Sequence, residues 1–266
     1  TDNNKKMKLQ RYTQQSKLKL LLEKLVKSNV IFYKIAFIIK EKLLGSLFYE
    51  EDLKGLDFLS INRNNACIDV GANVGQSIEY FKSRFKKVYA FEPNPKNFIF
   101  LKKKYKNKKN ISIFNFALGD KKENKFLYVP YWKNLISLHQ SASFFKEECY
   151  KTLKEFLNIN KSSIKLKKTR VRVERMDKFK FKDISFIKID AEGYEKQILL
   201  GMRSYLKKKD IILLIENSSR SFQFCKNFLK KYDFEPFAFK DDKMIKKKLN
   251  DSLNIYFLKK KKRTLN

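Results

Sequence analysis

The chain has 266 residues, of which 43% are hydrophobic and 15% aromatic, and it contains only 7 glycines and 4 prolines. This composition excludes a disordered or collagen-like chain, and the length favours one large α/β domain with a sizeable core. The 61 Lys and Arg against 28 Asp and Glu give a net charge of +33, which would attract nucleic acid, anionic lipid or acidic polymers. The lysines are spread through every segment, however, and this favours a compositional bias of the coding sequence with solvated faces over a functional anionic partner.

The three cysteines, Cys67, Cys149 and Cys225, are far apart and form no CxxC pair. Neither a disulfide framework nor a zinc site is indicated, and a reducing cytoplasm is the expected location. No secretory signal is visible at the start of the chain. The most apolar stretch, residues 29–39, contains Lys34 and is too short for a membrane span.

Residues 1–60 are predicted to form a basic helical arm, because apolar residues recur at helical spacing between Leu18 and Ile39. One interpretation is a helix that packs on the catalytic core or on a second copy of the chain. The other is peripheral attachment to a membrane, since lysines flank the apolar face.

From residue 66 onward, short apolar runs alternate with amphipathic segments, as in βαβ units that form a parallel sheet. The expected strands are 66–70, 88–91, 111–116, 186–190, 211–215, 234–239 and 254–258. The expected helices are 76–85, 96–105, 194–205 and 221–231. The strands are continuous apolar runs, which predicts helices on both faces of the sheet.

The interval between the third and fourth strands is too long for a simple crossover, and it contains strand-like runs at 125–129 and 168–174. An insertion at this point, about residues 120–175, lies beside the carboxyl ends of the central strands, where ligands bind. We expect it to hold the acceptor substrate. Its aromatic and polar side chains suit a sugar ring, and the candidates are Trp132, Asn134, Ser137 and Gln140.

A nucleotide site is predicted where the first strand runs into a turn of small residues. Gly71 and Gly75 allow a tight turn and a close approach of the ligand, and the following helix points its amides at that ligand. The pattern is GxNxG rather than GxGxxG, so the spacing that holds a pyrophosphate is missing. Glu92 ends the second strand, about 20 residues further on, where a carboxylate accepts both hydroxyls of a ribose. These features favour an adenosine ligand without an obligatory phosphate.

Four short motifs, at residues 69–75, 91–93, 117–120 and 187–195, follow one another in a characteristic order. In these motifs the sequence resembles the FkbM-type methyltransferases, S-adenosylmethionine-dependent enzymes that mostly methylate hydroxyl groups of sugars and other natural products. The resemblance implies a class I, Rossmann-like methyltransferase domain over residues 61–266. It also implies a three-layer αβα sandwich with strand order 3-2-1-4-5-7-6 and an antiparallel last strand.

The resemblance further implies roles in cofactor binding. Asp69 and the turn from Gly71 through Asn73 to Gly75 would hold the methionine end, with Asp69 near its ammonium group. Glu92 would bind the ribose. The backbone at Ala117 and Leu118 would meet the edge of the adenine. A purely structural role of Asp69 in orienting the turn stays open.

Three candidate catalytic residues follow from the same reasoning. Methyl transfer is an in-line displacement in which the acceptor hydroxyl must lose a proton. By fold analogy Asp190 and Glu192 face the sulfonium, with Asp190 the first choice as base or acceptor anchor. The carboxylates could instead cap the next helix or bind a divalent cation, and no metal is predicted. His139, the only histidine, is the third candidate, because imidazole is the natural base near neutral pH.

The predicted function is methylation of a hydroxyl on a saccharide or a comparable small metabolite, as in polysaccharide biosynthesis. An RNA methyltransferase would make use of the charge, but the sequence lacks the Asn/Asp-Pro-Pro-Tyr/Phe motif of enzymes that modify amino groups. A catalytically silent scaffold that binds S-adenosylmethionine is the other alternative.

Overall fold

The computed structural model describes residues 51–133, 136–157, 160–246 and 252–260. Most of the predicted N-terminal arm lies outside these residues. Its last part, Glu51–Phe58, forms the 3-10 helix η2. None of the helices in the described part of the chain is long and apolar enough to cross a membrane.

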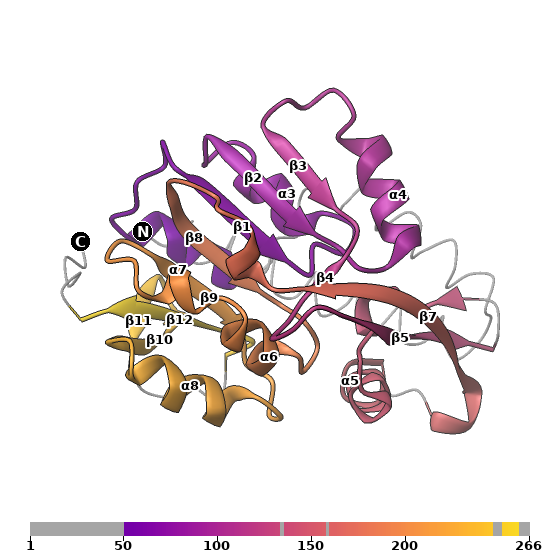
Figure 1. Ribbon diagram of the computed structural model, residues 1–266. Coiled ribbons are helices and arrows are strands. Elements are labelled where there is room, and N and C mark those ends of the chain that lie inside the picture. Colours follow the sequence, from indigo (N-terminus) through magenta and orange to yellow (C-terminus); the bar gives the residue numbers. More distant parts are fainter. Residues whose placement is uncertain (1–50, 134–135, 158–159, 247–251, 261–266) are drawn as a thin grey trace, which may run out of the picture.

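The main sheet has the order β3-β2-β1-β8-β9-β12-β10-β11 (Figure 1). Its strands are β1 (Ala66–Val70), β2 (Lys87–Phe91), β3 (Ile111–Phe114), β8 (Ile184–Ile189), β9 (Ile212–Glu216), β10 (Phe234–Lys240), β11 (Lys243–Ile245) and β12 (Asn254–Lys259). Neighbouring strands are parallel along β3-β2-β1-β8-β9, whereas β12 runs antiparallel to both β9 and β10. The predicted order 3-2-1-4-5-7-6 is therefore confirmed, and β11 extends the sheet at the β10 edge.

Helices cover both faces of this sheet. Successive side chains of a strand point to opposite faces, so the continuous apolar strands present apolar side chains on both. Ile68 and Ile187 pack with α6 (Glu195–Leu200), α7 (Arg203–Leu206) and α8 (Phe222–Lys230). The neighbouring Cys67 and Phe186 pack with η2, α3 (Gln76–Phe81) and α4 (Pro95–Lys104). The molecule is thus the predicted three-layer αβα sandwich.

Two helices differ from the sequence prediction. The predicted helix 194–205 divides into α6 and α7 at Gly201, where a Cβ atom would lie 1.8 Å from the carbonyl oxygen of Gly119. The helix is interrupted where these two backbones approach each other closely. In addition, helix α5 (Lys146–Leu157) forms within the predicted insertion and buries Cys149 and Leu153.

The insertion builds a second sheet with the order β4-β7-β5-β6. Its strands are β4 (Ala117–Leu118), β5 (Glu123–Trp132), β6 (Ile136–Ser137) and β7 (Ile164–Glu174). β5 and β7 pair along their whole length and project from the main sheet, with α5 beside them (Figure 1). Short 3-10 helices complete the region: η3 (His139–Ser141), η4 (Lys161–Ser163) and η5 (Met176–Lys178). This arrangement places η3 at the carboxyl ends of the central strands.

Candidate active site

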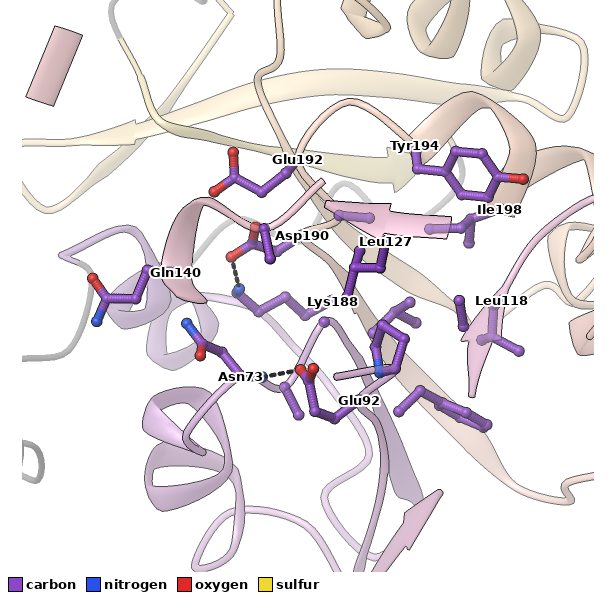
Figure 2. Close-up of a pocket in the computed structure, with 18 of the residues that line it drawn as sticks. Asn73, Glu92, Leu118, Leu127, Gln140, Lys188, Asp190, Glu192, Tyr194 and Ile198 are labelled. Carbon is purple, nitrogen blue, oxygen red and sulfur yellow. Dashed lines mark hydrogen bonds and ion pairs between the residues drawn. The ribbon is translucent and has the colours of Figure 1, made fainter. Parts of the chain in front are cut away.

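A cavity of about 210 Å³ lies where the turn after β1, the end of β2, the end of β8 and the inserted region meet. Figure 2 shows that Asn73, Glu92, Lys188 and Asp190 converge on it. All four lie at or just beyond the carboxyl ends of the parallel strands β1, β2 and β8, which is where ligands bind in open α/β sheets. Sequence-distant residues therefore form one site.

The turn after β1 needs glycine at position 71. Gly71 has φ +84°, and a Cβ atom there would lie 1.8 Å from the carbonyl oxygen of Asp190. The amides of Gly71 and Ala72 both donate to the carbonyl oxygen of Phe91, at 3.0 and 3.1 Å. The turn is thereby held against the ends of both neighbouring strands, and its backbone lines the cavity.

Glu92 is buried at the end of β2, and each of its carboxylate oxygens accepts one backbone hydrogen bond. Oε2 accepts from the amide of Asn73 at 2.7 Å, and Oε1 accepts from the amide of Asn94 at 2.8 Å. Burial raises the pKa of Glu92 to about 8, although the two amides act in the opposite direction. Each oxygen has a second lone pair, so the carboxylate can accept a hydroxyl on each side, as a ribose requires. Together with the glycine turn, this geometry fits an adenosine cofactor.

His139 connects the inserted region to the turn after β1. Its Nδ1 lies 2.8 Å from Oδ1 of Asn73, and the same oxygen accepts from Nδ2 of Asn97 at 3.0 Å. Because Oδ1 is an acceptor, Nδ1 of the imidazole carries the proton and Nε2 is a proton acceptor. Burial lowers the pKa of His139 to about 4, so the ring is neutral at pH 7.

Lys188 and Asp190 form an ion pair at the end of β8. The lysine Nζ lies 2.6 Å from Oδ2 of Asp190, and Lys188 is only 1% exposed. Both residues line the cavity (Figure 2). The sequence analysis did not identify Lys188. The available signal was a lysine inside an otherwise apolar strand, which is rare unless the charge is paired.

Further carboxylates lie beside this pair. Oxygens of Asp190, Glu192 and Glu216 all lie within 4.8 Å of one another, and the carboxyl groups of Glu216 and Glu195 are hydrogen-bonded. Burial and the neighbouring carboxylates raise the pKa of Glu192 to about 8, and they also raise the pKa of Glu216. Such a cluster is stabilised either by protons or by a divalent cation. The absence of a metal stays a prediction.

No side chain caps helix α6, whose N-cap is Tyr194, and Glu195, the first residue of the helix, instead holds the turn that precedes it. Oε1 of Glu195 accepts from the amides of Gly193 at 3.0 Å and Ala191 at 3.2 Å. Oε2 accepts from the hydroxyl of Ser221. Asp190 and Glu192 are therefore left to face the cavity.

The other predicted site residues lie at different distances from the cavity. Ala117 and Leu118, in β4, line its wall beside Phe91, whereas Asp69 is buried within β1 and Gly75 contacts Tyr105 behind the turn. Among the predicted acceptor contacts, Gln140 lines the cavity, and Trp132 and Ser137 are not part of its lining. Asn134 lies outside the described residues. The predicted roles of these residues stay predictions.

The strand order, with its antiparallel β12, is that of the class I methyltransferase fold, and the cavity lies at the carboxyl ends of its central strands. The sequence model described as the methyltransferase FkbM domain matches residues 69–236, and the chain belongs to this family. S-adenosylmethionine is accordingly its cofactor. No curated protein matches the chain.

The solved structures that are similar to the chain include two methyltransferases. A methyltransferase FkbM from Methylobacillus flagellatus is 16% identical with a TM-score of 0.49, and the match covers 80% of this chain and 47% of that chain. A TehB-like SAM-dependent methyltransferase from Corynebacterium glutamicum is 12% identical with a TM-score of 0.45, with 85% of this chain and 97% of that chain covered. The match thus spans about half the length of the FkbM structure.

Proposed function

We propose that the protein transfers the methyl group of S-adenosylmethionine to a hydroxyl group of a saccharide or a comparable small metabolite, in polysaccharide biosynthesis. The observation that carries the proposal is the placement of two proton-accepting groups on one cavity with the cofactor turn. These groups are the carboxylate of Asp190 and the neutral imidazole of His139. A hydroxyl acceptor needs such a group, because its proton must leave as the new bond forms.

The residues at the end of β8 have different roles toward the acceptor: one accepts its proton and another anchors it. The cofactor supplies a methyl group activated on a sulfonium. Asp190, oriented by Lys188 at 2.6 Å, is the first candidate to accept the proton of the hydroxyl. Glu192 has a pKa of about 8 and is mostly protonated at neutral pH, so it donates a hydrogen bond and anchors the acceptor. His139, neutral at pH 7, is the second candidate base.

The net charge of +33 favours a second candidate function, methylation of RNA. A polyanion would be attracted wherever the lysines cluster, with an affinity that falls steeply as salt is added. A scaffold that binds the cofactor without turnover is a third. The three functions differ in where a labelled methyl group is found after incubation.

The test is to incubate the purified chain with methyl-labelled S-adenosylmethionine and either a cell-surface glycan extract or total RNA. We expect label in the saccharide fraction. In Asp190→Asn the rate of transfer should fall about 100-fold or more, while the affinity for S-adenosylhomocysteine in calorimetry is retained. Asp183→Asn, an exposed aspartate just before β8, is the matched control and should keep full activity.

Three results would contradict the proposal. Label in RNA alone would favour the polyanion substrate. Cofactor binding without any transfer would favour the scaffold. Full turnover of Asp190→Asn would remove this residue from the role of base or anchor, and His139→Gln would then be measured in the same assay.

A further inference from the structure

Helix α4 presents two adjacent apolar side chains to solvent. Its inner face is formed by Asn97 and Leu101, which are buried, and Tyr105 follows on the same side. On the outer side Ile99 is 66% exposed and Phe100 is 47% exposed. Exposed side chains of this size cost free energy in water, so an adjacent pair on a helix marks a contact surface.

Lysines surround this apolar pair, and no acidic residue accompanies them in the sequence. Between residues 93 and 119 the chain has no Asp or Glu. Its lysines there are Lys96, Lys102, Lys103, Lys104, Lys106, Lys108 and Lys109. Lys104 pairs with Glu79 of α3 at 3.2 Å. We call the exposed side of α4 and the turn after it, residues 96–109, the α4 surface.

We propose that the α4 surface binds the headgroup region of an anionic lipid bilayer. A helix with an exposed apolar pair among lysines lies in the plane of such an interface, with the apolar side chains inserted and the ammonium groups on lipid phosphates. Each lysine near an anionic surface adds attraction that falls off within a Debye length. The surface therefore has both components that peripheral attachment requires.

The apolar component distinguishes a bilayer from nucleic acid. A nucleic acid would be bound by the lysines alone or by stacking on an aromatic ring. Ile99 has no π face and is the more exposed member of the pair. Phosphate contacts would leave it in water, whereas the acyl boundary of a bilayer would bury it.

The position of α4 relates the surface to the cavity. Pro93 lines the cavity, and α4 begins two residues later at Pro95. Figure 1 shows α4 beside β3, at the opposite end of the molecule from α8 and β10. This inference rests on the surface itself and is independent of the acceptor proposed above.

The test is sedimentation of the full chain with vesicles of phosphatidylcholine alone or of phosphatidylcholine and phosphatidylglycerol in equal parts. We expect binding to the anionic vesicles. The double variant Ile99→Ser with Phe100→Ser should bind them at least about tenfold more weakly, since each inserted side chain contributes to partition. The double variant Lys102→Glu with Lys103→Glu should lose about 100-fold or more, because two attractive charges become repulsive.

Two controls separate the α4 surface from net charge and general exposure. Lys180→Glu with Lys182→Glu makes the same change in net charge at exposed positions before β8, and Leu253→Ser removes another exposed apolar residue, 59% exposed. Both should bind vesicles as the unchanged chain does. Retained affinity for S-adenosylhomocysteine confirms that each variant is folded.

Three outcomes would overturn the proposal. In the first, both α4 variants bind anionic vesicles normally. In the second, the Lys180 and Lys182 variant loses as much binding as the α4 variants, so that only net charge matters. In the third, the chain fails to bind vesicles but binds a single-stranded oligonucleotide that Lys102→Glu with Lys103→Glu no longer binds, which assigns the surface to nucleic acid.

Discussion

Glu92 combines a buried position with two backbone hydrogen bonds, and its protonation controls what it can bind. With a pKa of about 8, the free carboxyl is mostly protonated at neutral pH. Accepting two ribose hydroxyls requires the ionised form, so ligand binding and loss of a proton are coupled. The affinity for an adenosine ligand must then rise with pH until the pKa is passed.

We predict that the affinity for methylthioadenosine, which lacks the titrating amino acid portion, increases up to about tenfold per pH unit below pH 8 and then levels off. Glu92→Gln should bind it at least about tenfold more weakly and with little pH dependence, because the amide cannot ionise. Calorimetry across this pH range measures both effects. Glu147→Gln, an exposed position in α5, is the control; equal slopes for Glu92→Gln and the unchanged chain would contradict the prediction.

The sequence predicted those residues of the site that directly follow a recognisable strand. Gly71, Glu92 and Asp190 each follow an apolar strand, and the ends of parallel strands meet at one edge of the sheet. Lys188 and Glu216 were missed, because their contacts with Asp190 depend on which residues face the cavity and on the neighbour of β8 in the sheet. The lysine within an apolar strand indicates that its charge is paired, but the identity of its partner and the approach of Glu216 are long-range facts that no local pattern contains.

At the scale of elements, strands were predicted more accurately than helices. Continuous apolar runs predicted every parallel strand of the main sheet to within a few residues, since burial on both faces leaves a strong signal. Helix α5 was missed because half of its residues are charged, and the buried apolar residues Cys149 and Leu153 are a weak signal. The helix predicted over 194–205 was interrupted because Gly201 meets Gly119.

Helix α4 is anchored to the end of β2 by the residue that precedes it, Asn94. Asn94 is the N-cap: its side chain accepts from the amide of Lys96 at 3.1 Å, and its own amide donates to Glu92. We predict that Asn94→Ala lowers the free energy of unfolding by about 1 kcal/mol, the usual cost of a lost cap. Thermal unfolding measures this, with the exposed Asn107→Ala as the control; equal stability of the two variants would show that the cap is dispensable.

At the scale of the whole molecule, several carboxyl groups with raised pKa values lie close together in a strongly basic chain. Glu92 and Glu192 have pKa values of about 8, and burial also raises the pKa values of Glu195 and Glu216. All four lie around the cavity and the adjoining end of β9. An enzyme site is the usual place for such a concentration of shifted groups.

This arrangement sets the direction in which stability changes with pH. Each raised pKa means that the folded state holds a proton that the unfolded chain releases at about pH 4.5. The stabilisation from these protons is fully present below about pH 4.5 and is lost as pH rises through the folded pKa values, which are about 8 for Glu92 and Glu192. Between these limits each group contributes about 1.4 kcal/mol per pH unit to the decline.

We predict that the free energy of unfolding falls by at least about 2 kcal/mol between about pH 5.5 and about pH 8. Denaturant unfolding in moderate salt, which screens repulsion among the surface lysines, measures it. Glu216→Gln should reduce the slope by about one proton, because its amide cannot ionise, whereas the exposed Glu147→Gln should leave the slope unchanged. A stability that rises over this range would mean that the cluster is held by a bound cation rather than by protons, and added chelator would then lower it.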